Sequence, residues 1–245
     1  MTAFQELDVL FLQARELEAV AAHERFCLSD LCDLREEQVD AVNFPLEGYV
    51  EWGRVEQADA VIVGGSGVYS ATDHHDWIER MLDTVRRVIE TGKPMFAVCF
   101  GQHLIARALG GEVVTDPKHR EIGAREIYLT PAGNDDPIFG RCPSHFPALL
   151  AHNDHVRTLP DGCVELAKNE TCPNQAFRVK DKPVYATLFH AELTPRTLLD
   201  RLQRYRGLYC PDQEEFEEAV ASLRPTPDAE SILKRFLTQC VAQPA

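Results

Sequence analysis

The first half of the chain alternates short apolar runs with segments of helical periodicity. The apolar runs, at residues 7–13, 39–44, 58–67 and 94–99, predict buried strands. Between the last two runs, apolar side chains recur at helical spacing at Trp77, Ile78, Met81, Leu82, Val85, Val88 and Ile89. Gly92 and Pro94 end that helix, and residues 101–111 predict another. Such alternation of strand and helix predicts a parallel sheet with crossover helices.

The second half changes to short strand candidates separated by turn residues. They lie at residues 111–114, 121–129, 146–152, 163–169, 174–180 and 183–190. Strands of this kind predict a mixed or antiparallel extension of the sheet. From Thr194 onward the pattern becomes helical, and we expect these helices to pack against the outside of the sheet. Because no linker interrupts the sequence, the 245 residues predict a single domain, 1–245.

Composition narrows the possible partners. A formal net charge of −14 disfavours nucleic acids and anionic membrane surfaces, because both bind basic surfaces. No apolar run is long enough for a membrane span, and residues 1–18 lack the basic region of a signal peptide, so we expect a cytoplasmic protein. The eight cysteines are scattered and form no CxxC pair, which predicts reduced thiols and no metal site. We also expect no cofactor.

Cys99 is the first candidate for chemistry. It lies where a predicted strand passes abruptly into a helix, and Ala97 and Gly101 are small enough for the tight turn of a nucleophile elbow. Such a turn presents a side chain at the carboxyl edge of the sheet, where open α/β sheets bind ligands. The N-terminus of the following helix would favour a thiolate. The alternative is a small buried core residue, which free cysteines usually are.

A thiol nucleophile needs a base, and the base needs a group that orients it. His190 and Glu192 follow an apolar run and are two residues apart, so on extended backbone both side chains point the same way. Glu192 could then hold the imidazole of His190 in one tautomer. The alternative is a solvated His-x-Glu pair on the surface.

A glycine-rich turn, Gly64-Gly65-Ser66-Gly67, follows the apolar residues 60–63. Glycines let backbone N–H groups approach an oxyanion closely, so this turn could stabilise a tetrahedral intermediate. A flexible turn and a phosphate-binding loop are the alternatives, although the turn has neither the GxGxxG nor the Walker pattern.

Three segments in family order resemble class I (triad) glutamine amidotransferases. They are VIVGGSG at 61–67, AVCFGQHLIARALGG at 97–111 and LFHAELTP at 188–195, and the resemblance covers roughly residues 5–200. The chain looks like a stand-alone protein similar to the glutaminase domain of GMP synthase. The fold class expected is α/β: a three-layer flavodoxin-like sandwich with a central, mostly parallel sheet, an antiparallel extension and helices on both faces. Residues 201–245 would add C-terminal helices packed on that core.

The resemblance also implies roles and a reaction. Cys99 would be the nucleophile, His190 the general base and Glu192 the residue that orients the base. The amides of Gly65 and Phe100 would form the oxyanion hole. The implied reaction is attack on the side-chain amide of glutamine, release of ammonia and hydrolysis of a glutamyl thioester.

Around the substrate, the chain departs from the family pattern. His103 stands four residues after Cys99, where the family usually has a glutamine that helps to grip the substrate. Ala191 replaces a usual proline, which removes a fixed φ from that turn. The candidate substrate contacts are Gly64, Ser66, Gln102, His103, His152 and Asp154. For the last two, a solvated turn is the alternative.

Three functions remain open. The first is a glutamine amidotransferase that passes ammonia to a separate synthetase, because the chain contains no phosphate loop of the ATP-pyrophosphatase type. The second is a γ-glutamyl peptidase or hydrolase with the same Cys-His-Glu chemistry, which His103 favours. The third is a non-catalytic regulatory binding protein, which the intact set of three residues disfavours. The expected substrate is glutamine or another γ-glutamyl compound.

Overall fold

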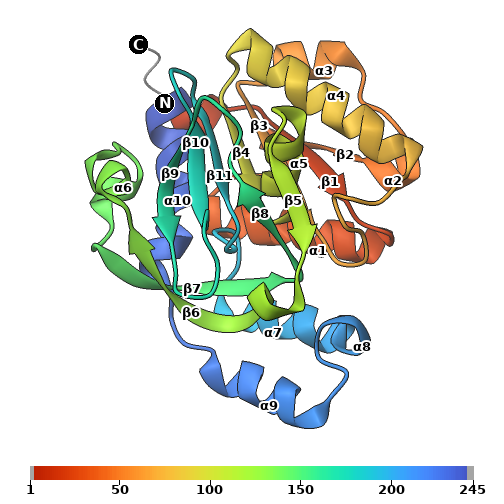
Figure 1. Cartoon of the computed structure of the whole chain (residues 1–245). Helices are drawn as coiled ribbons and strands as arrows, with labels where there is room; N and C mark the ends of the chain where they lie inside the picture. Colours follow the sequence, from red (N-terminus) through yellow and green to blue (C-terminus); the bar gives the residue numbers. More distant parts are fainter. Residues whose placement is uncertain (1–2, 242–245) are drawn as a thin grey trace.

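The computed structural model describes residues 3–241 and is built on a nine-stranded mixed sheet (Figure 1). The strands lie in the order β2-β1-β3-β4-β11-β10-β9-β6-β7. The strands are β1 Val9–Ala14, β2 Val39–Asn43, β3 Ala60–Ser66, β4 Met95–Val98, β5 Glu112–Thr115, β6 Glu121–Leu129, β7 His145–His152, β8 Asp154–Thr158, β9 Cys163–Lys168, β10 Ala176–Val179 and β11 Val184–Thr187. The α-helices are α1 Glu18–Cys32, α2 Phe44–Glu47, α3 Trp52–Gln57, α4 Asp76–Thr91, α5 Phe100–Ala108, α6 Pro131–Asp135, α7 Pro195–Arg204, α8 Arg206–Tyr209, α9 Gln213–Ser222 and α10 Pro227–Phe236. Short 3-10 and π turns are η1 Ala3–Glu6, η2 Glu36–Gln38, η3 Pro117–His119, η4 Phe139–Arg141 and η5 Leu237–Val241.

The sheet has a parallel part and an antiparallel part. The strands from β2 to β11 run parallel to one another, and those from β10 to β7 run antiparallel to their neighbours. Every residue of β1, β3, β4 and β11 is buried, because helices cover both faces of this part. That burial explains why these strands are continuous apolar runs in the sequence. The predicted parallel sheet with an antiparallel extension is confirmed.

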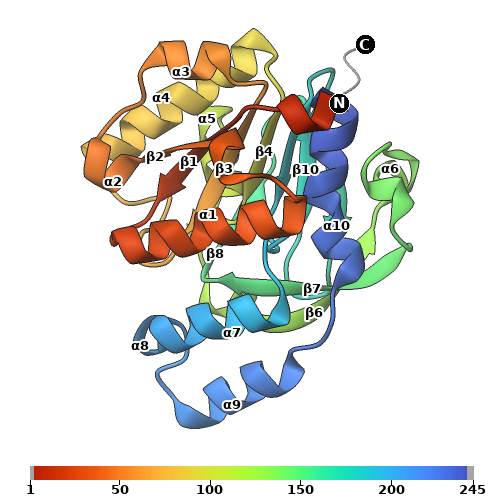
Figure 2. The same cartoon turned by 180° about the vertical axis from the view of Figure 1, so that it is seen from behind.

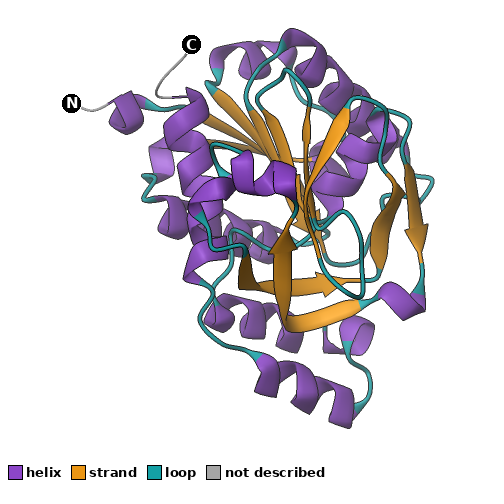
Figure 3. Cartoon of the chain, turned by 60° about the vertical axis from the view of Figure 1, so that its left-hand side comes forward, coloured by secondary structure: helices purple, strands orange, loops and turns teal. Residues whose placement is uncertain are grey.

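Helices cover the two faces of the sheet in separate layers. On one face, shown in Figure 2, α1 and α10 contribute Leu28 and Phe236 to an apolar cluster with the central strands. On the other face, α4 and α5 contribute Met81 and Leu104 to a second cluster. Figure 3 shows helices flanking the sheet on both sides. The predicted three-layer sandwich is thus confirmed.

The second half differs from the prediction in two places. Residues 111–114 do not extend the main sheet, because β5 pairs with β8 in a separate two-stranded antiparallel sheet. The sequence pattern does not predict β8, since Val156 is the one apolar residue in this strand. The strand predicted at residues 183–190 ends at Thr187, so its last three residues belong to a turn.

The C-terminal helices pack in two places. α7, α8 and α9 lie against β6 and β7, where Leu198 and Ala219 join Leu149 in a third apolar cluster. α10 returns to the main sheet (Figure 2). None of these helices, nor any other in the described part of the chain, is both long and apolar enough to cross a membrane.

Candidate active site

Cys99 lies at a sharp turn between β4 and α5. Its φ of 51° and ψ of −107° are unusual for a residue with a side chain, so the surrounding structure must hold the turn. Its N–H donates to Thr187 O at 2.8 Å, which ties the turn to the end of β11. Gly101 leaves no room for a side chain, since an added Cβ would lie 2.6 Å from Val63 O. The backbone therefore holds Cys99 at the carboxyl edge of the parallel strands, in the tight turn that the sequence predicts.

His190 and Glu192 lie beside Cys99 in the turn that follows β11. His190 Nδ1 lies 2.8 Å from Glu192 Oε1, and the side chain of Cys99 lies close enough to the His190 imidazole to help raise its pKa. The extended backbone assumed for this pair is wrong, because the strand has already ended. Instead, the His190 N–H donates to Leu149 O at 2.8 Å, and this bond fixes the turn against β7. The structure thus brings the three residues together by a route that the sequence pattern does not predict.

Arg201 in α7 extends this group behind His190. Its Nη1 donates to the same Glu192 oxygen at 3.1 Å. Burial would lower the pKa of His190, but the charge of Glu192, the hydrogen bond to Glu192 and the neighbouring Cys99 side chain raise this pKa to about 9. Burial would raise the pKa of Glu192, but His190 and Arg201 lower it to about 2. The environment therefore favours a protonated imidazole beside an ionised carboxylate.

The glycine-rich turn lies close to both Cys99 and His190. A Cβ built on Gly65 would be 3.5 Å from His190 Cε1 and 3.8 Å from Cys99 Cβ. The Gly65 N–H, one of the two predicted oxyanion donors, is bonded to Glu24 Oε1 at 3.2 Å. The Phe100 N–H, the other predicted donor, belongs to the first turn of α5, where N–H groups have no helical acceptor.

Glu24 is a buried anchor for this turn that the sequence pattern does not reveal. Its carboxylate is fully buried and also accepts hydrogen bonds from Gln13 Nε2 at 2.8 Å and Arg15 at 2.5 Å. Burial would lower the pKa of Arg15, but the charge of Glu24 raises it. A Cβ on Gly64 would lie 2.8 Å from Glu24 Oε1, so Gly64 allows the carboxylate to approach the turn. Gly64 therefore faces the anchor, and the structure does not bring it to the substrate side.

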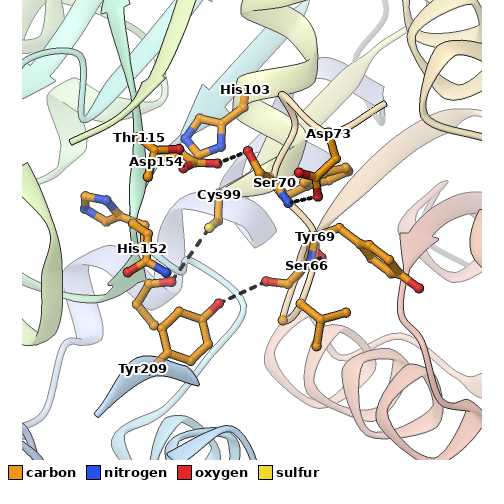
Figure 4. A pocket seen from close by; sticks show the side chains of 15 residues that line it. Ser66, Tyr69, Ser70, Asp73, Cys99, His103, Thr115, His152, Asp154 and Tyr209 are labelled. Carbon is orange, nitrogen blue, oxygen red and sulfur yellow. Dashed lines mark hydrogen bonds between the residues drawn. The ribbon is translucent and has the colours of Figure 1, made fainter. Parts of the chain in front are cut away.

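A cavity of about 220 Å³ opens beside Cys99 (Figure 4). The predicted substrate contacts in its walls are Ser66, His103, His152 and Asp154. Gln102 lies elsewhere, because it is fully buried and its Nε2 donates to Asn174 O at 2.8 Å. The walls also contain residues that were not predicted from the sequence, namely Tyr69, Ser70, Asp73, Thr115, Asn153 and Tyr209. Ser70 and Asp73 follow a central strand, and this position is the one signal that could have found them.

Asp154 joins two walls of this cavity. Its carboxylate accepts hydrogen bonds from Ser70 Oγ at 2.5 Å and from Thr115 Oγ1 at 2.6 Å. The ring of His103 lies close to Asp154, and burial lowers the pKa of this histidine to about 4. The imidazole of His103 is therefore neutral near pH 7, and its buried Nε2 has no partner among the described residues.

His152 and Asp154 are buried, and the solvated turn considered for them is wrong. Their exposed fractions are 2% and 7%, because they lie where β7 ends and β8 begins. His152 Nε2 lies 3.2 Å from Glu121 Oε2, an oxygen that also accepts from Gln175 Nε2 at 2.6 Å. Despite this density of polar side chains, residues 3–241 contain no group of three or more His, Cys, Asp or Glu arranged to hold a metal ion.

Comparison with known proteins shows to which family the chain belongs. The family model for glutamine amidotransferase class-I matches residues 29–203, which is more than half of the chain. The chain belongs to this family.

Curated relatives of this amidotransferase-family chain include GMP synthases. A protein from Thermoplasma acidophilum, named as one subunit of a glutamine-hydrolysing GMP synthase, is 29% identical over 160 residues, which are 65% of this chain and 75% of that protein. The glutamine-hydrolysing GMP synthase from Thermosipho africanus is 31% identical over 115 residues, which are 47% of this chain and 21% of that protein. The matched part is thus about a fifth of the length of the Thermosipho africanus synthase.

Solved structures share the fold. A glutamine amidotransferase from Thermotoga maritima has a TM-score of 0.77 at 18% identity and covers 97% of this chain and 99% of its own. A glutamine amidotransferase from Methylobacillus flagellatus has a TM-score of 0.71 at 19% identity and covers 95% and 94%. At such identities the likeness concerns the fold alone, and it confirms the predicted flavodoxin-like sandwich.

Proposed function

We propose that this chain hydrolyses the side-chain amide of glutamine through a glutamyl thioester on Cys99. The observation that carries the proposal is the buried series Cys99, His190 and Glu192 beside a cavity of about 220 Å³. A thiol next to an imidazole that a carboxylate orients is the arrangement that nucleophilic catalysis requires. Membership of the class I family and relatives named as glutamine-hydrolysing support the same substrate.

In the proposed reaction, the thiol proton of Cys99 has already passed to His190 Nε2 before the substrate is attacked, which agrees with a protonated imidazole, while Nδ1–H stays bonded to Glu192. The Sγ atom attacks the amide carbon to give a tetrahedral intermediate. Its C–N bond breaks as His190 returns the proton to the nitrogen, and ammonia leaves. A water molecule then attacks the thioester and gives one proton to His190. Sγ is displaced and recovers that proton as glutamate leaves.

The N-terminus of α5 would stabilise the oxyanion, with the Phe100 N–H as one donor. For Gly65 to be the second donor, its N–H has to turn away from Glu24, to which it is bonded at 3.2 Å. We therefore propose that Phe100 is a donor in the resting state and that Gly65 becomes one when substrate is bound.

A separate synthetase is the proposed acceptor of the ammonia. The Thermoplasma acidophilum relative is named as one subunit of a GMP synthase, which supports an acceptor on another chain. We also propose a cytoplasmic location, because the seven cysteines whose side chains are described are all free, as expected in a reducing compartment.

A γ-glutamyl peptidase is the second candidate. It is favoured by His103, which lines the cavity where the family usually has a glutamine in contact with the substrate. Its chemistry at Cys99 would be the same, and the leaving amine would be larger.

Turnover assays on the purified chain test both candidates. Ammonia and glutamate are followed with glutamine and, separately, with γ-glutamyl peptides. The variants are Cys99→Ser and, as a matched control, Cys163→Ser, which changes a partly buried free cysteine in β9. We expect glutamine turnover that Cys99→Ser lowers by about 10⁴-fold or more and that Cys163→Ser leaves unchanged.

Turnover of peptides without turnover of glutamine would favour the peptidase. The catalytic proposal fails if neither substrate is consumed and a glutamine-analogue electrophile leaves Cys99 unlabelled.

A further inference from the structure

A second, much smaller cavity lies next to His190. Its volume is about 20 Å³, and its walls include Arg15, His190, Arg201 and Tyr209. The large and small cavities share four wall residues, namely Ser66, Gly67, Ala151 and Tyr209. Cys99 belongs to the wall of the large cavity and His190 to that of the small one. The two cavities are therefore neighbours, and each of them contacts one member of the reacting pair.

The chemistry of the proposed reaction assigns one half of the substrate to each cavity. The base that takes the thiol proton later gives it to the leaving nitrogen, so that nitrogen must be within hydrogen-bond reach of His190. The leaving group therefore occupies the small cavity. The acyl half, bonded to Cys99, extends into the large one.

The charges around the cavities agree with this orientation. The large cavity is lined by the carboxylates of Asp73 and Asp154, which attract the α-ammonium group of a glutamyl half. The small cavity is lined by the guanidinium groups of Arg15 and Arg201, which disfavour a cation. Arg15 Nε and Arg201 Nε are buried without a hydrogen-bond partner among the described residues. A small neutral molecule with a lone pair, such as ammonia or water, suits these donors.

The volume of the small cavity sets a limit on the leaving group. A cavity needs roughly 10–15 Å³ to hold one water molecule, so about 20 Å³ accepts one molecule of the size of water or ammonia. It has no room for a substituent on the nitrogen.

Tyr209 has the largest side chain of the four residues that line both cavities, and its hydroxyl and its ring are both held in place. Its hydroxyl donates to Ser66 O at 3.2 Å (Figure 4). Its ring packs edge-to-face on Tyr205, with the ring centroids 6.2 Å apart. The ring of Tyr205 in turn fills the space over Gly67, where an added Cβ would lie 2.3 Å from Tyr205 Cζ. The wall is thus part of the packing between α8 and the turn that follows β3.

We infer that Tyr209 is a specificity-determining residue that restricts the substrate to unsubstituted carboxamides, with ammonia as the leaving group. The inference rests on the proposed function and separates its two candidates, because a peptidase would need space for a larger amine next to His190. According to this inference, the leaving group is selected by a residue of α8, which follows Cys99, His190 and Glu192 in the sequence.

Steady-state kinetics with glutamine and γ-glutamyl methylamide test the inference, since the two substrates differ by one methyl group on the nitrogen. We expect kcat/KM of the native chain to be about a hundredfold lower for the methylamide. Tyr209→Ala should join the two cavities. The ratio of kcat/KM for glutamine to kcat/KM for the methylamide should then fall about tenfold or more. Tyr209→Leu replaces the ring by a smaller side chain that still makes an apolar contact with Tyr205. This variant should lower the same ratio by less than Tyr209→Ala does.

Two controls separate the size of the ring from other effects. Tyr209→Phe removes the bond to Ser66 but keeps the ring, so the ratio should stay as in the native chain. Leu208→Ala changes the neighbouring side chain, which is 54% exposed, and should keep both the ratio and the glutamine rate.

The outcomes distinguish the inference from the function on which it rests. Native chain that consumes the methylamide as efficiently as glutamine, with turnover lost in Cys99→Ser, overturns the inference and leaves the proposed chemistry intact. An unchanged ratio in both Tyr209→Ala and Tyr209→Leu, each folded by circular dichroism, also overturns it. Absence of any Cys99-dependent turnover overturns both.

Discussion

Glu192 shares one oxygen between two basic partners. Its Oε1 lies 2.8 Å from His190 Nδ1 and 3.1 Å from Arg201 Nη1, and all three side chains are buried. A buried carboxylate between two cations stays ionised, and its charge in turn keeps the imidazole protonated. Because the unfolded chain has no such environment, this group links the stability of the fold to pH.

His190 and Glu192 each contribute to the stability of the folded state, and the two contributions should change with pH in opposite directions. The folded pKa of His190, about 9, is above its ordinary value of 6.5, so this contribution is complete below pH 6.5 and disappears as the pH rises to 9. The folded pKa of Glu192, about 2, is below its ordinary value of 4.5, so this contribution is complete above pH 4.5 and disappears as the pH falls to 2.

Thermal unfolding of the native chain and of His190→Gln across this pH range measures the effect. The native chain should have the higher Tm, and the difference between the two proteins should be largest at about pH 5–6. It should shrink toward alkaline pH, where His190 loses its proton in the folded state, and toward acid pH, where Glu192 gains one. A difference in Tm that stays constant with pH would contradict the charge assignment.

At the scale of elements, two segments outside the main sheet form facing walls of the large cavity. Ser70 belongs to the loop between β3 and α4, and Thr115 and Asp154 belong to the small β5–β8 sheet. The carboxylate of Asp154 accepts a hydrogen bond from each of the other two, Ser70 and Thr115. Since neither segment pairs with the main sheet, this contact helps to set the width of the cavity between them.

Ser70→Ala should therefore weaken substrate binding more than it slows the chemical step. The variant loses the bond to Asp154, and a hydrogen bond to a charged group is worth about 1.5–3 kcal/mol, so KM for glutamine should rise about tenfold or more. Because Cys99 and His190 lie on other elements, kcat should change much less. Steady-state kinetics measure both constants. Ser231→Ala, a matched change in α10, should alter neither, and an unchanged KM in Ser70→Ala would show that the contact does not shape the cavity.

The elements that could be predicted are those that their own residues determine. Each central strand carries its own apolar run, and Cys99 and His190 follow such runs directly, so the parallel sheet and its carboxyl edge could be predicted from local patterns. Glu24 and Tyr209 could not, because they act through contacts with Gly65 and Ser66 that lie 41 and 143 residues away along the chain. One sequence contains no local pattern for such pairings.

At the scale of the whole molecule, the helix α10 packs behind the two strands that lead to the proposed nucleophile and base. The ring of Phe236 in α10 lies 5.4 Å from Phe96 in β4 and 5.8 Å from Tyr185 in β11, measured between centroids. β4 leads into Cys99, and β11 leads into the turn of His190. If residues 1–245 are one domain, loosening α10 should weaken the whole fold and not only its end.

Phe236→Ala tests this dependence. Phe236 is fully buried, so the change should lower the free energy of unfolding by about 3–5 kcal/mol and the Tm by about 2–4 °C for each kcal/mol. Phe26→Ala makes the same change on α1, where the side chain is 58% exposed, and should stay within about 0.5 kcal/mol of the native chain. Denaturant unfolding followed by circular dichroism, tryptophan fluorescence and glutamine turnover should give coincident transitions, as one cooperative unit requires. An early transition that removes helix signal but preserves turnover would instead make α10 a separable appendage. Its packing against β4 and β11 argues against that outcome, because any movement of this helix exposes the apolar backs of both strands to water.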